Sequence, residues 1–317
     1  MKKLISLLLA VSVLLGMAAF ASAENESKTL YYPAALVDAE GETLVLDKTP
    51  ERIVCLSNAA LQVLVRSGVV PMAITSLNAS ANFPDWVREL PQITISMGSL
   101  DIEAVVAMEP DLVIVGEYQK ESYGQQLADA GIPVYYTLEG PSISYEDTKD
   151  QARALALSFG DEALAEEIAA EFSAVEQRAL DFAAAHEKQT MMIFFSAPGA
   201  YQQTSAGYLG GMLSFLPFEN LSDALVGKDM PTAPIDVETC ISLNPEVIFA
   251  ISPMARTAEM LQEQFEEVFH SDPDLWNQMD AVRNGKVIYL SNEYVTTKGI
   301  QVIDSMNKLI DLLAETL

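Results

Sequence analysis

The sequence is poor in the residues that most often carry catalytic or metal-binding chemistry. Its 317 residues include only two cysteines, Cys55 and Cys240, and only two histidines, His186 and His270. Two isolated histidines do not supply a histidine-based metal site, and no H-E-x-x-H, G-x-S-x-G or Walker pattern occurs. The residues therefore predict no enzyme, no metal site and no resident cofactor. The cysteines are far apart in the chain, and we expect two buried thiols rather than a disulfide.

Positive charge is also scarce. Lysine and arginine total 18 residues against 45 aspartates and glutamates, which gives a formal net charge of −27. A surface with this charge repels nucleic acid and anionic membranes. Neither is expected as a partner.

Long apolar stretches are confined to the start of the chain. Residues 1–23 consist of a basic start, an apolar stretch and the small residues Ala21-Ser22-Ala23. This is the pattern of a secretory signal peptide with its cleavage site. No cysteine lies near that site, since the first is Cys55, so a lipid anchor on a cysteine at the mature N-terminus is not expected. We expect a soluble protein exported to the periplasm or another extracytoplasmic space.

Strand-like and helix-like segments alternate through most of the chain. Apolar runs at residues 52–56, 72–75 and 112–116 are separated by polar loops and by segments with helical spacing. This alternation predicts an α/β fold with mainly parallel sheets. Residues 37–47 instead predict a β-hairpin that turns at Glu40-Gly41.

A stretch without glycine or proline divides the chain. Residues 161–188 are rich in alanine, glutamate and leucine, which are strong helix formers, and their apolar residues recur at helical spacing. The pattern predicts a stiff connecting helix within residues 159–188. An N-terminal α/β lobe of residues 24–158 would precede it, and a C-terminal α/β lobe of residues 189–317 would follow.

One short pattern occurs in both predicted lobes. Residues 100–116, LDIEAVVAMEPDLVIVG, align without a gap with residues 235–251, IDVETCISLNPEVIFAI. Each copy has an aspartate at a helix N-cap position, a glutamate two residues later and then an apolar strand. The two lobes are therefore predicted to share one plan.

The order of these segments resembles that of the exported substrate-binding proteins of bacterial ABC importers, in the group that serves iron–siderophore, haem and cobalamin uptake. The likeness rests on residues 37–68, 97–115, 235–251 and 276–290 together with the long helix, and it extends from about Ala35 to the end of the chain. It implies two Rossmann-like lobes joined by one rigid helix, of the class III periplasmic-binding-protein type. It also implies a monomer that holds a small-molecule ligand between its lobes and delivers it to a transmembrane permease dimer with a cytoplasmic ATPase.

The resemblance also assigns a role to Glu103 and Glu238, the glutamates of the repeated pattern. By position they match one surface glutamate on each lobe that meets basic residues of the permease. An acid in the first turn of a helix is favoured by the helix dipole alone, so a purely structural role is the alternative.

Candidate ligand-binding residues lie on loops that leave strand ends, where open α/β sheets bind ligands. They are Ser57, Asn58, Asn78, Phe83, Ser96, Met97, Tyr118, Tyr201, Gln202, Met230, Asn292, Glu293 and Tyr294. The tyrosines suit a large, flat ligand, and few basic residues accompany them. We therefore expect a corrinoid or haem, or a neutral or cationic hydroxamate chelate, before an anionic ferric siderophore. For haem, Tyr118, Tyr201 or Met97 could ligate the iron.

Two other functions stay open on the residues alone. One is an extracytoplasmic ligand sensor or scavenger that does not dock on a permease. The other is an enzyme on a two-lobed α/β scaffold.

Overall fold

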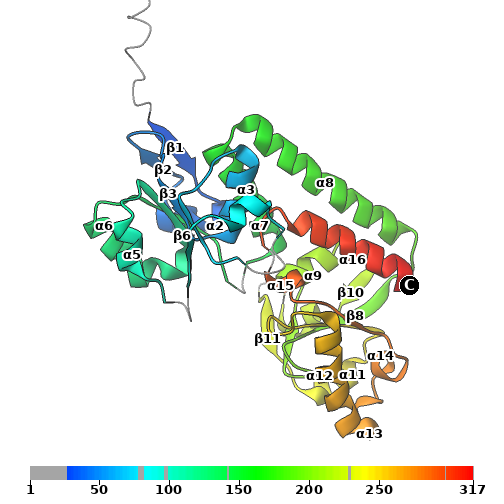
Figure 1. Ribbon diagram of the computed structural model, residues 1–317. Coiled ribbons are helices and arrows are strands. Elements are labelled where there is room, and N and C mark those ends of the chain that lie inside the picture. The colour runs from blue at the N-terminus through cyan, green and yellow to red at the C-terminus, as the bar shows by residue number, and fades with distance from the viewer. Residues whose placement is uncertain are drawn as a thin grey trace, which may run out of the picture.

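The computed structural model describes residues 27–77, 82–95, 99–140, 143–227, 230–296 and 298–316. Within these ranges the chain forms two α/β lobes, each built on its own sheet (Figure 1). This confirms the predicted fold class. The predicted signal peptide lies outside the described residues. Among the helices that are described, none has the length and apolar character needed to cross a membrane.

The N-terminal lobe is built on a five-stranded sheet in which all strands are parallel. Its central strands are buried over their whole length, as expected of a parallel sheet. In sheet order the strands are β5 (Gln92–Ile93), β4 (Ala73–Thr75), β3 (Ile53–Cys55), β6 (Leu112–Gly116) and β7 (Val134–Thr137). The helices of this lobe are α3 (Asn58–Ser67), α4 (Asp85–Arg88), α5 (Ile102–Ala107), α6 (Gln125–Asp129) and α7 (Tyr145–Phe159), with a 3-10 turn at Glu117–Gln119 and a π turn at Lys120–Gly124.

The prediction of a β-hairpin at residues 37–47 is wrong for the first of its two strands. That segment belongs to a helix, α2 (Ala34–Glu40), and only the second segment forms a strand, β2 (Thr43–Leu46), which pairs antiparallel with β1 (Lys28–Tyr31). Alanine and leucine at the start of α2 favour a helix. Gly41, with φ of 83°, ends that helix in a conformation that glycine adopts without strain.

The C-terminal lobe is built on a six-stranded mixed sheet. Strand β9 runs antiparallel to both of its neighbours, and the other described pairs in this sheet are parallel. The strands in order are β11 (Thr232–Pro234), β9 (Tyr201–Gln203), β8 (Gln189–Phe195), β12 (Val247–Ile251) and β13 (Val287–Tyr289), and β10 (Phe218–Asn220) pairs with the start of β8. The helices are α9 (Tyr208–Leu213), α10 (Ser222–Val226), α11 (Val237–Leu243), α12 (Ala258–Ser271), α13 (Pro273–Trp276), α14 (Asp280–Arg283) and α15 (Glu293–Thr296).

Two long helices lie side by side between the lobes (Figure 1). The predicted connecting helix is α8 (Glu162–Ala184), capped by Asp161. Beside it lies α16 (Val302–Thr316), and Arg178 of α8 donates to Asn307 Oδ1 at 2.6 Å and pairs with Asp311. The connection between the lobes is therefore double.

The chain returns to the N-terminal lobe just before α16. Gln62 of α3 is buried, and its amide Nε2 donates to the backbone carbonyl of Lys298 at 2.7 Å. Its Oε1 accepts from the backbone N–H of Gln301 at 2.9 Å. Both polar ends of one buried amide thus hold the segment 298–301 against α3.

The hydrophobic core continues from one lobe into the other. A single cluster of buried side chains includes Leu155 of α7, Leu209 of α9 and Phe249 of β12. Near the start of α7 the Tyr145 ring packs edge-on against Phe215, with 5.6 Å between centroids. The two sheets are separate, as predicted, but the lobes also pack directly on each other. The long helix is not their only link.

The two cysteines behave as predicted. Cys55 lies in β3 and Cys240 in α11, and both are buried and unbridged.

We predict that Gly299→Ala destabilises the protein by about 1–3 kcal/mol. Gly299 has φ of 94°, and an added Cβ would lie 2.6 Å from Gln62 Oε1 and 3.0 Å from Ala59 Cα. The matched control is Gly68→Ala, where φ is 80° but no atom lies within 4 Å of the added Cβ. Urea unfolding should show the larger loss for Gly299→Ala. Equal losses would mean that the close contact with α3 adds nothing beyond backbone strain.

Candidate ligand site at the inter-lobe seam

The parallel strands of the N-terminal lobe end at one edge of their sheet, and polar side chains gather there. Ser57 follows β3, Glu117 follows β6 and Glu139 follows β7. Lys298 joins them from the segment before α16. We call these four residues the seam cluster. Strand ends of this kind are where α/β folds bind ligands.

Glu139 is at the centre of the seam cluster. Its Oε1 accepts from Ser57 Oγ at 2.6 Å and from Thr137 Oγ1 at 3.4 Å. Its backbone N–H donates to Glu117 Oε2 at 2.8 Å. Ser57 Oγ also accepts from the N–H of Ala60 and thereby caps α3. The start of α3 and the two carboxylates are therefore fixed relative to one another.

Lys298 places a positive charge beside these carboxylates. Its Nζ donates to the backbone carbonyl of Gly140. The same atom lies 5.4 Å from the centre of the Tyr208 ring, which belongs to α9 of the C-terminal lobe. A carbonyl, two carboxylates and an aromatic face together suit an organic cation.

Burial controls the ionisation of the seam cluster. Loss of hydration lowers the pKa of Lys298 from 10.5 to about 8, although the charges of Glu139 and Glu117 act in the opposite direction. Burial likewise raises the pKa of Glu139 and of Glu117, against the attraction of Lys298. For each charged group, the hydration free energy lost on burial thus exceeds the attraction that it gains from its oppositely charged neighbours.

In the N-terminal lobe the structure brings three predicted ligand residues to the seam. Ser57 belongs to the cluster, and Asn58 beside it has a buried Oδ1 that finds no hydrogen-bond partner within the described residues. Tyr118 is 54% exposed. A Cβ built on Gly116 would meet both the Tyr118 ring and the Glu139 side chain, so this tyrosine lies against the cluster.

One further predicted residue of this lobe is described and does not reach the seam surface. Phe83 is buried in the hydrophobic core. Asn78, Ser96 and Met97 lie outside the described residues.

In the C-terminal lobe the predicted residues separate into two places on the edge strands. Tyr201 begins β9 next to the end of β8, because Gln202 pairs with Phe194, and its side chain is half exposed. Gln202 is buried, and its Oε1 has no partner in the part of the chain that the structure describes. Met230 precedes β11, whose far end pairs with Tyr201. Met230 is therefore not brought together with Tyr201.

The last three predicted residues follow β13 and have mainly structural contacts. Asn292 Nδ2 donates to the carbonyl of Pro253 at 3.3 Å, which ties together two loops at strand ends. Glu293 pairs with Lys308 of α16 at 3.4 Å. Tyr294 is buried in the core.

Sequence reasoning missed Glu117 and Glu139. A signal was present, because each acid follows an apolar strand closely, in VIVGE and in YYTLE. Since the carboxyl ends of neighbouring parallel strands meet at one edge, the two acids could have been expected to lie together.

The two glutamates of the repeated pattern occupy equivalent places. Glu103 lies in the first turn of α5 and Glu238 in the first turn of α11, and both are exposed. The predicted N-caps are confirmed, since Asp101 Oδ1 accepts from Ala104 N at 3.0 Å and Asp236 Oδ1 from Thr239 N at 2.8 Å.

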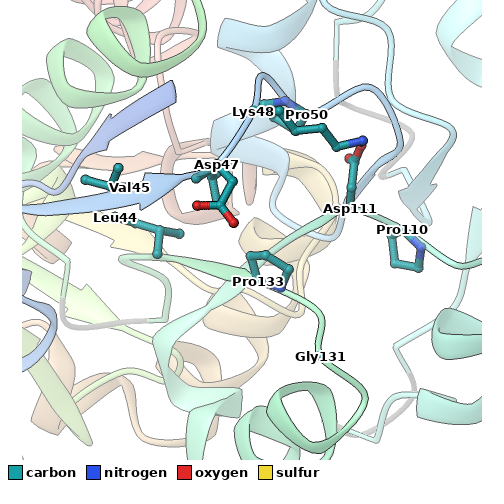
Figure 2. A pocket seen from close by; sticks show the side chains of 10 residues that line it. Leu44, Val45, Asp47, Lys48, Pro50, Pro110, Asp111, Gly131 and Pro133 are labelled. Carbon is teal, nitrogen blue, oxygen red and sulfur yellow. The ribbon is translucent and has the colours of Figure 1, made fainter. Parts of the chain in front are cut away.

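A separate pocket of about 440 Å³ lies at the opposite ends of the strands of the N-terminal sheet, beside the residues that precede β6 and β7 (Figure 2). Its polar groups are engaged in holding the chain. Asp111 accepts from the backbone N–H groups of Glu51 and Arg52 at 3.0 and 2.8 Å and pairs with Lys48 at 3.5 Å. We therefore place the candidate site at the seam and not in this pocket. The described residues contain no cluster of three or more His, Cys, Asp or Glu side chains suited to a metal ion.

We predict that Lys298 makes the protein more stable as the pH rises from about 8 to about 10. The folded chain loses the Lys298 proton near pH 8, whereas the unfolded chain keeps it to about 10.5. Unfolding therefore takes up a proton in this interval. Urea unfolding should show a gain of about 1–2 kcal/mol relative to Lys298→Met. The control Lys286→Met removes an exposed lysine and should behave as the wild type. Identical pH profiles for wild type and Lys298→Met would contradict the lowered pKa.

Comparison with known sequences identifies the fold's relatives. Residues 53–294 match a family model described as periplasmic binding protein. An uncharacterized ABC transporter substrate-binding lipoprotein of Bacillus subtilis, YvrC, is 21% identical over 291 residues, which cover 90% of this chain and 87% of the relative. The Fe(3+) dicitrate-binding periplasmic protein FecB of Escherichia coli is 26% identical over 275 residues, with coverage of 84% and 86%.

Solved structures give the same result for the fold. Staphylococcus aureus IsdE complexed with heme has a TM-score of 0.64 and 21% identity, covering 82% of this chain and 98% of that one. The periplasmic vitamin B12 binding protein BtuF of Vibrio cholerae has a TM-score of 0.61 and 16% identity, covering 84% and 97%. Since the family model spans most of its length, the chain belongs to the periplasmic binding protein family.

Proposed function

We propose that this chain is the extracytoplasmic solute-binding component of an ABC importer. It captures an iron chelate, haem or a corrinoid between its lobes and delivers it to a membrane permease. The observation that carries the proposal is the seam cluster, because polar groups from three strand ends of one lobe meet Lys298 there, beside Tyr208 of the other lobe. The relatives that bind ferric dicitrate, heme and vitamin B12 support this class of ligand.

Two exposed tyrosines favour a ligand with a large flat face. Tyr118 lies beside the seam cluster, and Tyr201 lies at the start of β9 in the other lobe. Aromatic faces of this kind pack well against macrocycles and bulky chelates. One tyrosine from each lobe would allow contact with the ligand from both sides.

Binding fits the seam better than catalysis does. Ser57 and Glu139 form the one pair in the described cluster that resembles a nucleophile and a base. Ser57 is only 1% exposed and its Oγ is engaged as the cap of α3. A substrate cannot reach that oxygen without disrupting the helix start.

Glu103 and Glu238 are suited to docking on a permease. Each is exposed in the first turn of a short helix on a different lobe, and each helix is capped by the aspartate two residues earlier. Exposed carboxylates of this kind set orientation and association rate more than they add affinity. A monomer with one such acid on each lobe matches a permease with two basic contact sites.

The direct test of ligand capture is an absorption titration of the purified protein with haem, cobamides and ferric chelates. We expect one of these classes to bind and to shift its spectrum. Absence of binding across all three classes would contradict the proposed function.

We predict that the double variant Glu103→Arg/Glu238→Arg abolishes ligand uptake by cells and leaves ligand affinity unchanged. Reversing an exposed first-turn acid costs about 0.3–1 kcal/mol of stability at each helix, so the protein remains folded. The control is Glu162→Arg, which reverses an exposed first-turn acid of α8. Uptake that survives the double reversal would instead favour a sensor or scavenger that does not dock.

A further inference from the structure

The Lys298 ammonium occupies a cage that other groups form around it. Two groups contact it, the Gly140 carbonyl and the face of Tyr208. The carboxylates of Glu139 and Glu117 act on it electrostatically from beyond ion-pair distance. Each of these four groups favours a positive charge, either by direct attraction or by a cation–π contact.

Lys298 is held in this cage by one hydrogen bond and one cation–π contact, without an ion pair to either carboxylate. Its pKa falls to about 8 because burial removes more hydration energy than the two carboxylates restore. An ammonium released to water regains its hydration, and a cation that replaces it gives up its own, so the exchange depends on the contacts that each cation makes in the cage. The carboxylates left behind would be open to another cation.

The side chain can leave without moving the backbone. The backbone carbonyl of Lys298 accepts a hydrogen bond from the side-chain amide of Gln62. The backbone N–H of Gln301 donates to the oxygen of that amide, so the backbone on both sides of Gly299 is fixed. Lys298 is only partly buried, and its four-carbon stem is flexible. Departure of the ammonium thus requires rotation of one side chain and no separation of the lobes.

We propose that this cage recognises a positively charged group of the ligand, an ammonium or a similar organic cation, which replaces the Lys298 ammonium on binding. The inference rests on the proposed function and specifies the charge of the ligand. The Gly140 carbonyl and the Tyr208 face, which now hold the Lys298 ammonium, would hold the ligand ammonium in its place.

The cage also argues against polyanionic ligands. A chelate rich in carboxylates would face Glu117 and Glu139 in a partly buried site, where like charges reduce affinity. Ferric dicitrate, which the relative FecB is named for binding, is a ligand of this disfavoured kind.

The first test compares two ferric trihydroxamate chelates that differ only at one end. One ends in a free ammonium, and in the other this amine is N-acetylated and uncharged. Calorimetric titration should show that the ammonium form binds about tenfold or more tightly, as expected for a charge-assisted contact. Equal affinity for the two chelates would overturn the proposal, as would tighter binding of ferric citrate than of the ammonium form.

Matched variants locate the effect. Glu139→Gln and Glu117→Gln should each bring the affinity ratio of the two chelates towards one. Glu121→Gln removes the same charge from an exposed position on the turn after β6 and should keep the wild-type ratio. A ratio that stays at its wild-type value in Glu139→Gln and Glu117→Gln would contradict the cage.

A second test does not depend on the identity of the ligand. Lys298→Ala empties the cage, and butylammonium chloride should then raise the thermal unfolding midpoint in a saturable way, relative to sodium chloride at equal ionic strength. The wild type and Lys298→Ala/Glu139→Gln should show no such effect. If Lys298→Ala is unfolded alone, its refolding by butylammonium but not by sodium counts as the same result.

The two tests separate the two proposals. If no haem, cobamide or ferric chelate binds the wild type, the proposed function fails and the butylammonium experiment alone decides the cage. If butylammonium neither stabilises nor refolds Lys298→Ala, the cage proposal fails, while ligand capture at the seam can still hold.

Discussion

The hydrophobic packing that joins the two lobes is the constraint on which the site depends. Buried side chains of α7, α9 and the C-terminal sheet form one cluster, and Gln62 fixes the returning segment against α3. The strand ends of the N-terminal sheet are therefore held next to Lys298 and Tyr208. With the lobes fixed in this way, ligand entry depends on side-chain rotation and on small shifts between packed helices rather than on wide hinge opening.

Electrostatics act differently at the surface and at the seam. The large excess of acid over base is mostly exposed to water, where single charges have small effects on stability. Glu103 and Glu238 belong to this exposed group and are available to a partner. Glu117 and Glu139 are the opposite case. Burial raises the pKa of both carboxyl groups, and the nearby charge of Lys298 acts against this shift. In our proposals the same residue type therefore has two roles, docking for the exposed pair and ligand selection for the buried pair.

The sequence predicted the parts of the structure that repeat at a fixed period. The two copies around Asp101 and Asp236 became matching helix–strand units, and residues 161–188 contain the long helix α8. The hairpin predicted for residues 37–47 did not form in full, because the alternation of apolar and polar residues there is too short to outweigh the helix preference of the residues before it. Of the candidate site, the sequence located the loops but not the side-chain directions.

The side-chain directions depend on contacts between residues that are distant in the sequence. The side chains of Phe83 and Tyr294 are buried in the core, and Met230 lies at the end of β11 that is away from Tyr201. Hydrogen–deuterium exchange, with and without whichever haem, cobamide or ferric chelate binds, tests the central claim that ligand lies between the lobes. The account predicts protection around Glu117 and Glu139 of one lobe together with protection around Tyr201 of the other. Protection confined to one lobe, or to the pocket that Asp111 lines, would contradict it.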